Sequence, residues 1–188
     1  MSLVVAFDQS VKHSACAILQ WTSTGGFSVP DTMVFSPGVK GIAGLYEIRC
    51  WVNLILDQNA TLDLVVREMH NQRQFGAATQ LHAVNCIIDM QVWDHAQVGR
   101  LLLVPSTRWK KICLGSGNVK KDTGYLMRVN KFLQKTLRIP HEINDDNVAD
   151  AICLAFVGIL TLMHKNKIEW PHYSDKKVLD ELVASIGA

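Results

Sequence analysis

Four carboxylates stand at places in the sequence where a negative charge is costly unless something offsets it. Asp8 closes the first apolar run, and Glu68 closes a second apolar run. Asp146 and Asp150 open a long apolar stretch near the C-terminus. Carboxylates beside buried strands or helix starts are stable when a cation or hydrogen bonds compensate them. Carboxylate oxygens are also the ligands that Mg²⁺ prefers, so their convergence would form a hard-metal site suited to phosphodiester hydrolysis.

The secondary structure predicted around these carboxylates begins with a buried strand and a β-hairpin. Apolar runs alternate afterwards with amphipathic stretches of helical period. The predicted strands are 3–8, 14–21, 27–35, 62–68 and 101–104, and the predicted helices are 42–55, 77–93, 107–113, 123–137, 146–163 and 176–186. Because the last two strands are reached through helical crossovers, they should run parallel to the first. The sequence therefore predicts an α/β fold with a mixed five-stranded sheet, three antiparallel strands followed by two parallel strands, flanked by helices.

This topology predicts that the four carboxylates meet. If the first and fourth strands are parallel neighbours, Asp8 and Glu68 lie side by side, about 5 Å apart, at the edge where open α/β sheets place their sites. Asp146 and Asp150 are one helical turn apart and share a helix face. The simpler alternative is that Asp145 and Asp146 form a structural N-cap pair, since Asp is common at that position.

Length and composition limit the class of protein. With 188 residues, 48% of them hydrophobic, the chain can bury one full core, so we expect a single domain over 1–188, with its core at about 2–163 and a tail at about 166–188. No apolar run reaches the roughly 18 residues of a membrane span, and no signal peptide is recognised. The five cysteines are scattered, which indicates buried thiols in a reducing, cytoplasmic compartment.

The charge of the chain is unevenly distributed. The segment 106–138 holds nine basic side chains and one acidic one, a net charge of +8, so the remainder carries −6. On the predicted helix 123–137, Arg128, Lys131 and Lys135 lie on the face opposite the apolar residues. A basic segment on an acidic body is typical of a protein that binds a polyanion such as nucleic acid. The alternative is a solvated, lysine-rich surface.

Several motifs, taken in order, resemble the RuvC family of Holliday junction resolvases, in particular its phage-type members, within the ribonuclease H-like superfamily. The matching segments are Val4–Ser10, Val65–Glu68, Pro105–Lys110, Lys120–Lys121 and Ala149–Ala151. Each motif is weak alone, but their order agrees with the family from Ser2 to about Met163. The resemblance implies a ribonuclease H-like fold.

The resemblance also implies an activity. It would make the chain a homodimeric, Mg²⁺-dependent crossover junction endodeoxyribonuclease, with Mn²⁺ able to substitute, that cuts four-way DNA junctions in pairs. The implied metal ligands are Asp8, Glu68 and Asp150, and Asp146 is a candidate for the fourth place. Lys121, which follows a flexible glycine-rich loop, is the candidate for a further catalytic role. The helix 77–93 would form the dimer interface. The expected location is the cytoplasm, or the host-cell cytoplasm if a phage encodes the protein, with no membrane partner.

The chain departs from the family pattern at two places. Asn147 stands where many members carry an acidic residue. Either Asp146 takes its place from the same helix face, or the asparagine replaces an original acid and traps an inactive state. The aromatic wedge after the second acid is displaced to Phe75. The predicted DNA-contacting residues are Arg73, Phe75, Lys110, Lys111, Lys120, Lys121, Arg128, Lys131 and Lys135.

Two alternative functions remain open from the sequence. One is a ribonuclease H-like nuclease that acts on hybrid or flap substrates. The other is a junction-binding protein with impaired catalysis, which the asparagine at position 147 motivates. The histidines, among them His13 and His82, lack the spacing of metal ligands and are expected to be structural, although His70 could face the same cleft as Glu68.

Overall fold

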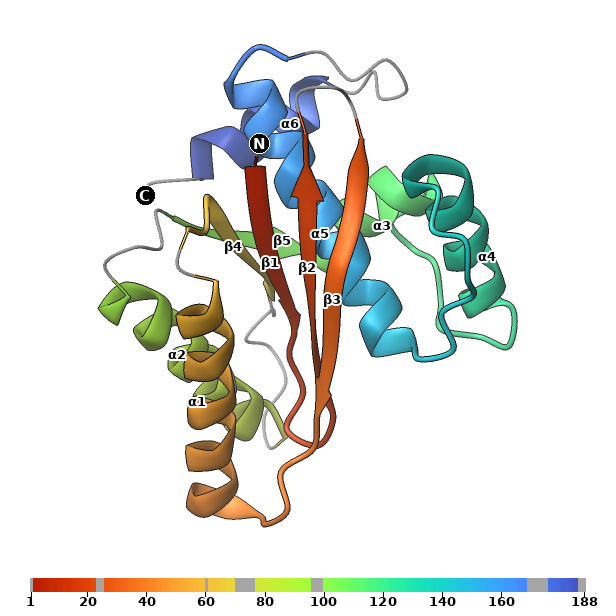
Figure 1. Cartoon of the computed structure of the whole chain (residues 1–188). Helices are drawn as coiled ribbons and strands as arrows, with labels where there is room; N and C mark the ends of the chain where they lie inside the picture. The colour runs from red at the N-terminus through yellow and green to blue at the C-terminus, as the bar shows by residue number, and fades with distance from the viewer. Residues whose placement is uncertain are drawn as a thin grey trace.

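Five strands form one mixed sheet in the computed structural model, which describes residues 2–22, 26–59, 61–69, 77–95, 100–168 and 176–185. The strands are β1 (Ser2–Asp8), β2 (Ser14–Trp21), β3 (Phe27–Phe35), β4 (Leu64–Met69) and β5 (Leu101–Pro105). Their order across the sheet is β3-β2-β1-β4-β5 (Figure 1). The β1, β2 and β3 pairings are antiparallel, whereas β4 and β5 run parallel to β1, so the predicted sheet is confirmed.

The register between β1 and β4 fixes where the first two carboxylates lie. Val4 pairs with Leu64, and Phe7 pairs with Arg67, in a parallel ladder. One step further along each strand are Asp8 and Glu68. Parallel strands end at the same edge of a sheet, so these two residues lie at neighbouring strand ends, as the sequence predicts.

The helices cover both faces of the sheet. Their bounds are α1 (Gly41–Gln58), α2 (Ala77–Asp94), α3 (Ser106–Leu114), α4 (Tyr125–Phe132), the π-helical turn η1 (Leu133–Leu137), α5 (Asp146–Lys165) and α6 (Lys176–Ser185). In Figure 1, α1 and α2 lie side by side, while α5 runs along the other face of the sheet. The helix predicted over 123–137 begins two residues later in the structure, at Tyr125, and its last turn widens into η1.

The end of η1 is closed by a left-handed residue. Arg138 has φ 56°, and the amide of Ile139 donates to the carbonyl of Leu133 over 3.4 Å. The amide of Arg138 donates to the same carbonyl, so a carbonyl of this widened last turn has donors where the helix ends. The chain then turns toward the start of α5.

Alternate residues of the strands enter two separate cores. Val4 and Val66 point to the side covered by α5, whereas Val5, Phe7 and Val65 point to the side covered by α1 and α2. This alternation follows from the two-residue period of a strand. Since both faces are covered, the strands are apolar throughout, which explains their continuous hydrophobic runs.

Helix α5 approaches the sheet closely at Gly158. A Cβ atom there would lie 2.6 Å from Cγ2 of Val66 and 2.9 Å from Cγ1 of Val4. The helix is long and apolar enough to cross a membrane, but 89% of its most apolar 18-residue window is buried inside the protein. It is therefore a core helix, and its tight packing fixes the N-terminal end that carries Asp146 and Asp150.

The cysteines depart from the prediction of uniformly buried thiols. All five are free, and Cys16, Cys113 and Cys153 are buried. Cys50 on α1 and Cys86 on α2 are exposed. Both cysteines have apolar neighbours in the sequence, but each lies on the side of its amphipathic helix that faces away from the sheet.

Candidate active site

The two strand-end carboxylates are partly or wholly withdrawn from solvent. Asp8 is only 8% exposed, and Glu68 is half-buried. Burial raises the pKa of Asp8 well above its usual value, and the nearby charges of Asp150 and Glu68 raise it further. Burial and the charge of Asp150 likewise raise the pKa of Glu68, against the lowering effect of a hydrogen bond with Ser106. Negative charge is thus concentrated at this edge of the sheet.

The helix carboxylates, in contrast, have a cation beside them. Asp150 is 2% exposed, and the Nζ of Lys121 lies 2.9 Å from its Oδ2 and 2.9 Å from Oδ2 of Asp146. The hydroxyl of Tyr125 donates to Oδ1 of Asp150. Burial still raises the pKa of Asp150, although Lys121 and Tyr125 act to lower it.

Lys121 stays charged in this setting. Partial burial lowers its pKa, but the charge of Asp150 and the hydrogen bonds to Asp150 and Asp146 raise it by more. The ammonium group therefore neutralises part of the cluster at neutral pH. Its side chain is 41% exposed, so it can also meet a group that arrives from solvent.

Three neighbouring residues at the start of α5 have different roles. Asp145 is the N-cap: its Oδ1 accepts from the amides of Asn147 (2.9 Å) and Val148 (3.0 Å). Its Oδ2 lies 2.9 Å from Nε2 of His13. The side-chain amide of Asn147 donates to the carbonyl of His13 over 3.3 Å. Only Asp146 of the three pairs with Lys121, so the N-cap alternative applies to Asp145 and not to Asp146.

The backbone at Glu68 is held by two side chains that the sequence analysis did not single out. Its carbonyl accepts from Nε2 of Gln9 (2.6 Å) and from Nη1 of Arg67 (3.0 Å). Arg67, itself 7% exposed, also makes a two-bond pair with Asp89 on α2, at 2.6 Å for each bond. Such bidentate pairs fix geometry as well as charge. The position of Glu68 is therefore tied to both β1 and α2.

Tyr125 is the most important residue that sequence reasoning missed. It is the first residue of α4 and is 2% exposed. Val129 and Leu133 follow at four-residue intervals and are buried, so the tyrosine falls on the apolar face of its helix. Its spacing therefore predicts a core aromatic. A buried tyrosine hydroxyl usually has a hydrogen-bond partner, and this general rule is the only sign in the sequence that Tyr125 makes a polar contact.

The predicted DNA-contacting residues fall into four groups. Lys110 lies near the carboxylates, since its charge lowers the pKa of Glu68 and of Asp150 as a secondary effect. The side chains that stand exposed on the basic segment are Lys111, Lys120, Lys121, Lys131 and Lys135. Arg128 is turned back, with Nη2 2.8 Å from Oδ1 of Asp122. His70, Arg73 and Phe75 lie outside the described residues.

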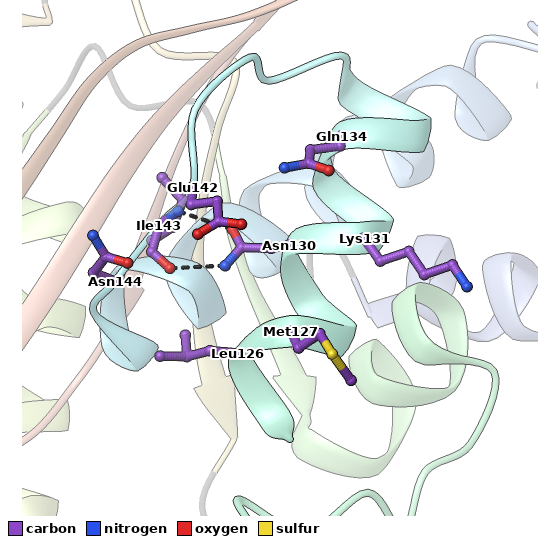
Figure 2. A pocket seen from close by; sticks show the side chains of 8 residues that line it. All are labelled: Leu126, Met127, Asn130, Lys131, Gln134, Glu142, Ile143 and Asn144. Atoms are coloured by element: carbon purple, nitrogen blue, oxygen red, sulfur yellow. Dashed lines mark hydrogen bonds between the residues drawn. The ribbon is translucent and has the colours of Figure 1, made fainter. Parts of the chain in front are cut away.

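A surface hollow near α4 is separate from the carboxylates. Figure 2 shows its walls, which come from α4, η1 and the segment before α5. The side-chain amide of Asn130 makes two hydrogen bonds of 2.9 Å with the backbone of Ile143 there. Lys131 points away from that pair (Figure 2). The contact anchors the loop that leads into α5, and so helps to place Asp146.

The carboxylates match a hard divalent cation in their chemistry. Asp8, Glu68, Asp146 and Asp150 supply only oxygen donors. Burial raises the pKa values of Asp8, Glu68 and Asp150, and neighbouring carboxylates raise those of Asp8 and Glu68 further. As the side chains stand, no three His, Cys, Asp or Glu residues in the described part of the chain are close enough together to hold a metal ion. A cationic group, the ammonium of Lys121, lies between Asp146 and Asp150 instead.

Solved structures with the same arrangement of strands and helices are found among junction resolvases. The Thermus thermophilus RuvC structure matches with a TM-score of 0.70 and 14% identity, over 87% of this chain and 96% of that one. The chain has the fold of RuvC. The T. thermophilus RuvC complex with a Holliday junction substrate gives a TM-score of 0.68 at 15% identity, over 82% and 91% of the two chains.

The RuvC fold extends to a more distant match. The fowlpox virus resolvase, in complex with Holliday junction DNA, gives a TM-score of 0.52 at 10% identity, over 86% of this chain and 99% of that one. The sequence itself matches no family model and no curated protein. The resemblance to RuvC-type resolvases and the ribonuclease H-like fold are thus confirmed by structure, where sequence comparison alone finds nothing.

Proposed function

We propose that this chain is a divalent-metal-dependent endonuclease that resolves four-way DNA junctions by paired phosphodiester hydrolysis. The observation that carries the proposal is the pair of buried carboxylates, Asp8 and Asp150, with the half-buried Glu68 near them and a segment of net charge +8 alongside, within the fold of RuvC. Carboxylates beside a surface that binds a polyanion repel the phosphates, unless a cation lies between the carboxylates and the phosphates. Two of the matching solved structures are complexes with Holliday junction DNA.

The residues that would hold Mg²⁺, or Mn²⁺ in its place, are Asp8, Glu68 and Asp150, with Asp146 as the fourth. The bound ions would activate water and stabilise the leaving oxygen. Gln9 and Arg67 hold the backbone of Glu68 in place.

Lys121 would also contact the DNA. Its ammonium balances Asp146 and Asp150 in the free protein, and its exposed side allows it to contact the phosphate that is cut. The hydroxyl of Tyr125 donates to Oδ1 of Asp150, and this hydrogen bond holds the carboxylate in its orientation toward the site.

The basic side chains would bind DNA through its phosphates. Lys110, Lys111, Lys120, Lys131 and Lys135 supply charge without reading bases, which suits recognition of a branched shape. Arg73 and Phe75 stay predictions for the loop after β4. Arg128 contributes indirectly, because it binds Asp122 and the carbonyl of Lys120 and thereby shapes the loop that carries Lys121.

We further propose that the protein acts as a homodimer through the side of the molecule formed by α1 and α2. Large apolar side chains are exposed on both helices, including Ile42 (88%), Tyr46 (63%), Met90 (61%) and Trp93 (88%). Large exposed apolar side chains on two packed helices are typical of an interaction surface. A two-fold dimer would present two sites to the two strands that a junction resolvase must cut.

A junction-binding protein with impaired catalysis is the second candidate. Asn147 stands at the position where an acid was expected, and its amide is engaged with the carbonyl of His13. Under this alternative the Lys121 ammonium serves as the permanent cation of the helix carboxylates.

The test is a substrate panel. The full chain is incubated with labelled four-way junction, duplex, flap and RNA–DNA hybrid, each with Mg²⁺ or with EDTA. We expect symmetric nicks confined to the junction, in Mg²⁺ only. Preferred cleavage of the hybrid or the flap would refute junction resolution, and binding of the junction without any cleavage would favour the second candidate.

A further inference from the structure

The exposed face of α2 carries a pair of metal-binding side chains, three and seven residues before Asp89, the residue of this helix that pairs with Arg67. Cys86 follows His82 by four residues, so both project from the same face. Both are exposed, and the Sγ of Cys86 lies 3.6 Å from Nε2 of His82. The pair does not stand out in the sequence, because the histidines lack metal-ligand spacing among themselves and the apolar context of the cysteine predicts burial.

The spacing of the two atoms suits zinc. Zinc binds cysteine sulfur at about 2.3 Å and histidine nitrogen at about 2.0–2.1 Å, in tetrahedral geometry. Two such ligands at a tetrahedral angle are separated by roughly 3.5 Å. The 3.6 Å between Sγ and Nε2 is therefore already close to the span of a chelating pair, with no rearrangement of the helix required.

Two ligands make only half of a structural zinc site, which takes four. Within the described residues no group of three His, Cys, Asp or Glu side chains completes the set. The pair lies within one turn of the middle of α2, which spans Ala77–Asp94. When two copies of one helix cross about a two-fold axis at their midpoints, residues near the midpoint meet their own counterparts. The missing ligands would then be supplied by the same two positions of a second chain.

Exposed apolar residues continue along the same stripe of the helix. Met90 follows Cys86 by four residues and Trp93 follows it by seven, and they are 61% and 88% exposed. All four side chains thus share one face of α2. An exposed methionine and tryptophan beside the pair indicate that this face is covered by another protein surface.

We propose that His82 and Cys86 of two chains bind one Zn²⁺ ion across a two-fold α2–α2 contact, in a His₂Cys₂ site. Each Cys86 thiol gives up its proton to solvent on binding, so two thiolates balance the charge of the ion. The site would be structural, with all four positions filled by protein. It rests on the homodimer proposed above and does not depend on the nuclease activity.

Cobalt provides the test, because Co²⁺ bound by thiolate absorbs in the near ultraviolet through ligand-to-metal charge transfer. The full chain, reduced and freed of metal, is titrated with Co²⁺ and then with Zn²⁺. We expect the band to saturate at one Co²⁺ per two chains and to disappear when Zn²⁺ is added. The molar mass in solution, measured by light scattering, should be that of a dimer with Zn²⁺ and should shift toward monomer with a chelator.

Variants separate this site from other metal binding. Cys86→Ser should abolish the charge-transfer band, and His82→Ala should reduce the affinity for Co²⁺ by at least tenfold. The matched control is Cys50→Ser, which removes the other exposed cysteine and should leave the band unchanged. Both positions on α2 are exposed, so circular dichroism should show the fold intact in all three proteins.

The outcomes are distinct from those of the nuclease test. A band that survives Cys86→Ser, or that saturates at one Co²⁺ per chain, would overturn the inter-chain site. If the band is absent in the parent protein, the pair binds no metal, whatever the junction assay shows. Loss of junction cleavage with an intact band would instead count against the proposed function.

Discussion

The strand-end and helix carboxylates lie in one site but are treated differently by the protein. Asp150 has a lysine and a tyrosine as direct partners, and Asp146 shares the lysine. Asp8 and Glu68 make no ion pair with another described residue, and burial and neighbouring negative charge raise the pKa values of both. The chain thus balances the helix half of the site by itself and leaves the strand half to a cation from outside.

This difference teaches which contacts are structural. Lys121 and Tyr125 stabilise the free protein, because Asp150 would otherwise be buried without a partner. Asp8 and Glu68 are costly in the free protein, and such costs are typical of residues retained for function. Changes to the two halves should therefore affect stability in opposite directions, and each variant below is a way to test that contrast.

Glu68→Gln should reduce cleavage strongly without destabilising the protein. It removes an anionic oxygen from the strand half, and loss of several kcal/mol of charge stabilisation corresponds to about 1,000-fold or more in rate. Single-turnover cleavage of a four-way junction at fixed Mg²⁺ measures it. The melting temperature in EDTA should stay equal or rise; a clear fall would show that Glu68 is compensated like the helix residues.

Lys121→Met should impair both cleavage and stability. Loss of one positioned donor to a reacting phosphate costs about 100-fold or more in rate. The unfolding free energy in EDTA should fall by about 1 kcal/mol, since solvent already screens the partly exposed ammonium. Lys120→Met, at the exposed neighbouring position, is the control and should leave stability unchanged. Equal stability of the two variants would contradict the account of the helix half.

Tyr125→Phe should destabilise the metal-free protein without a comparable loss of DNA binding. A hydrogen bond to a buried charged group contributes about 1.5–3 kcal/mol. Urea unfolding in EDTA gives the value, with Tyr46→Phe, at an exposed tyrosine, as the control. An unfolding free energy equal to that of the parent would mean that the hydroxyl does not support Asp150.

The pH dependence of stability should be the smallest and most specific effect. Because the folded-state pKa of Asp8 is raised, its carboxylate imposes no cost below the usual pKa of aspartate and an increasing cost as the pH rises through the raised value. Asp8→Asn should therefore match the parent near pH 4 and be more stable above it, in EDTA. A stability difference that is constant with pH would contradict the raised pKa.

Much of this arrangement could be predicted from the sequence, because it rests on local pattern. Strand alternation, helical period and crossover length were enough to place Asp8 beside Glu68 and to put Asp146 and Asp150 on one helix face. The sequence could not show that Tyr125 reaches Asp150 from 25 residues away, or that Arg67 pairs with Asp89. These contacts depend on how α4 and α2 dock, which hydropathy alone does not determine.

The central claim is that Asp8 belongs to a metal-dependent hydrolytic site. The most direct measurement follows cleavage and binding of one labelled four-way junction by the parent protein and by Asp8→Asn, in Mg²⁺. The control is Asp31→Asn, at an exposed aspartate on β3. We predict that Asp8→Asn abolishes cleavage and binds the junction as tightly as the parent or more tightly, because a negative charge near phosphate is removed. Cleavage by Asp8→Asn at the parental rate would contradict the account.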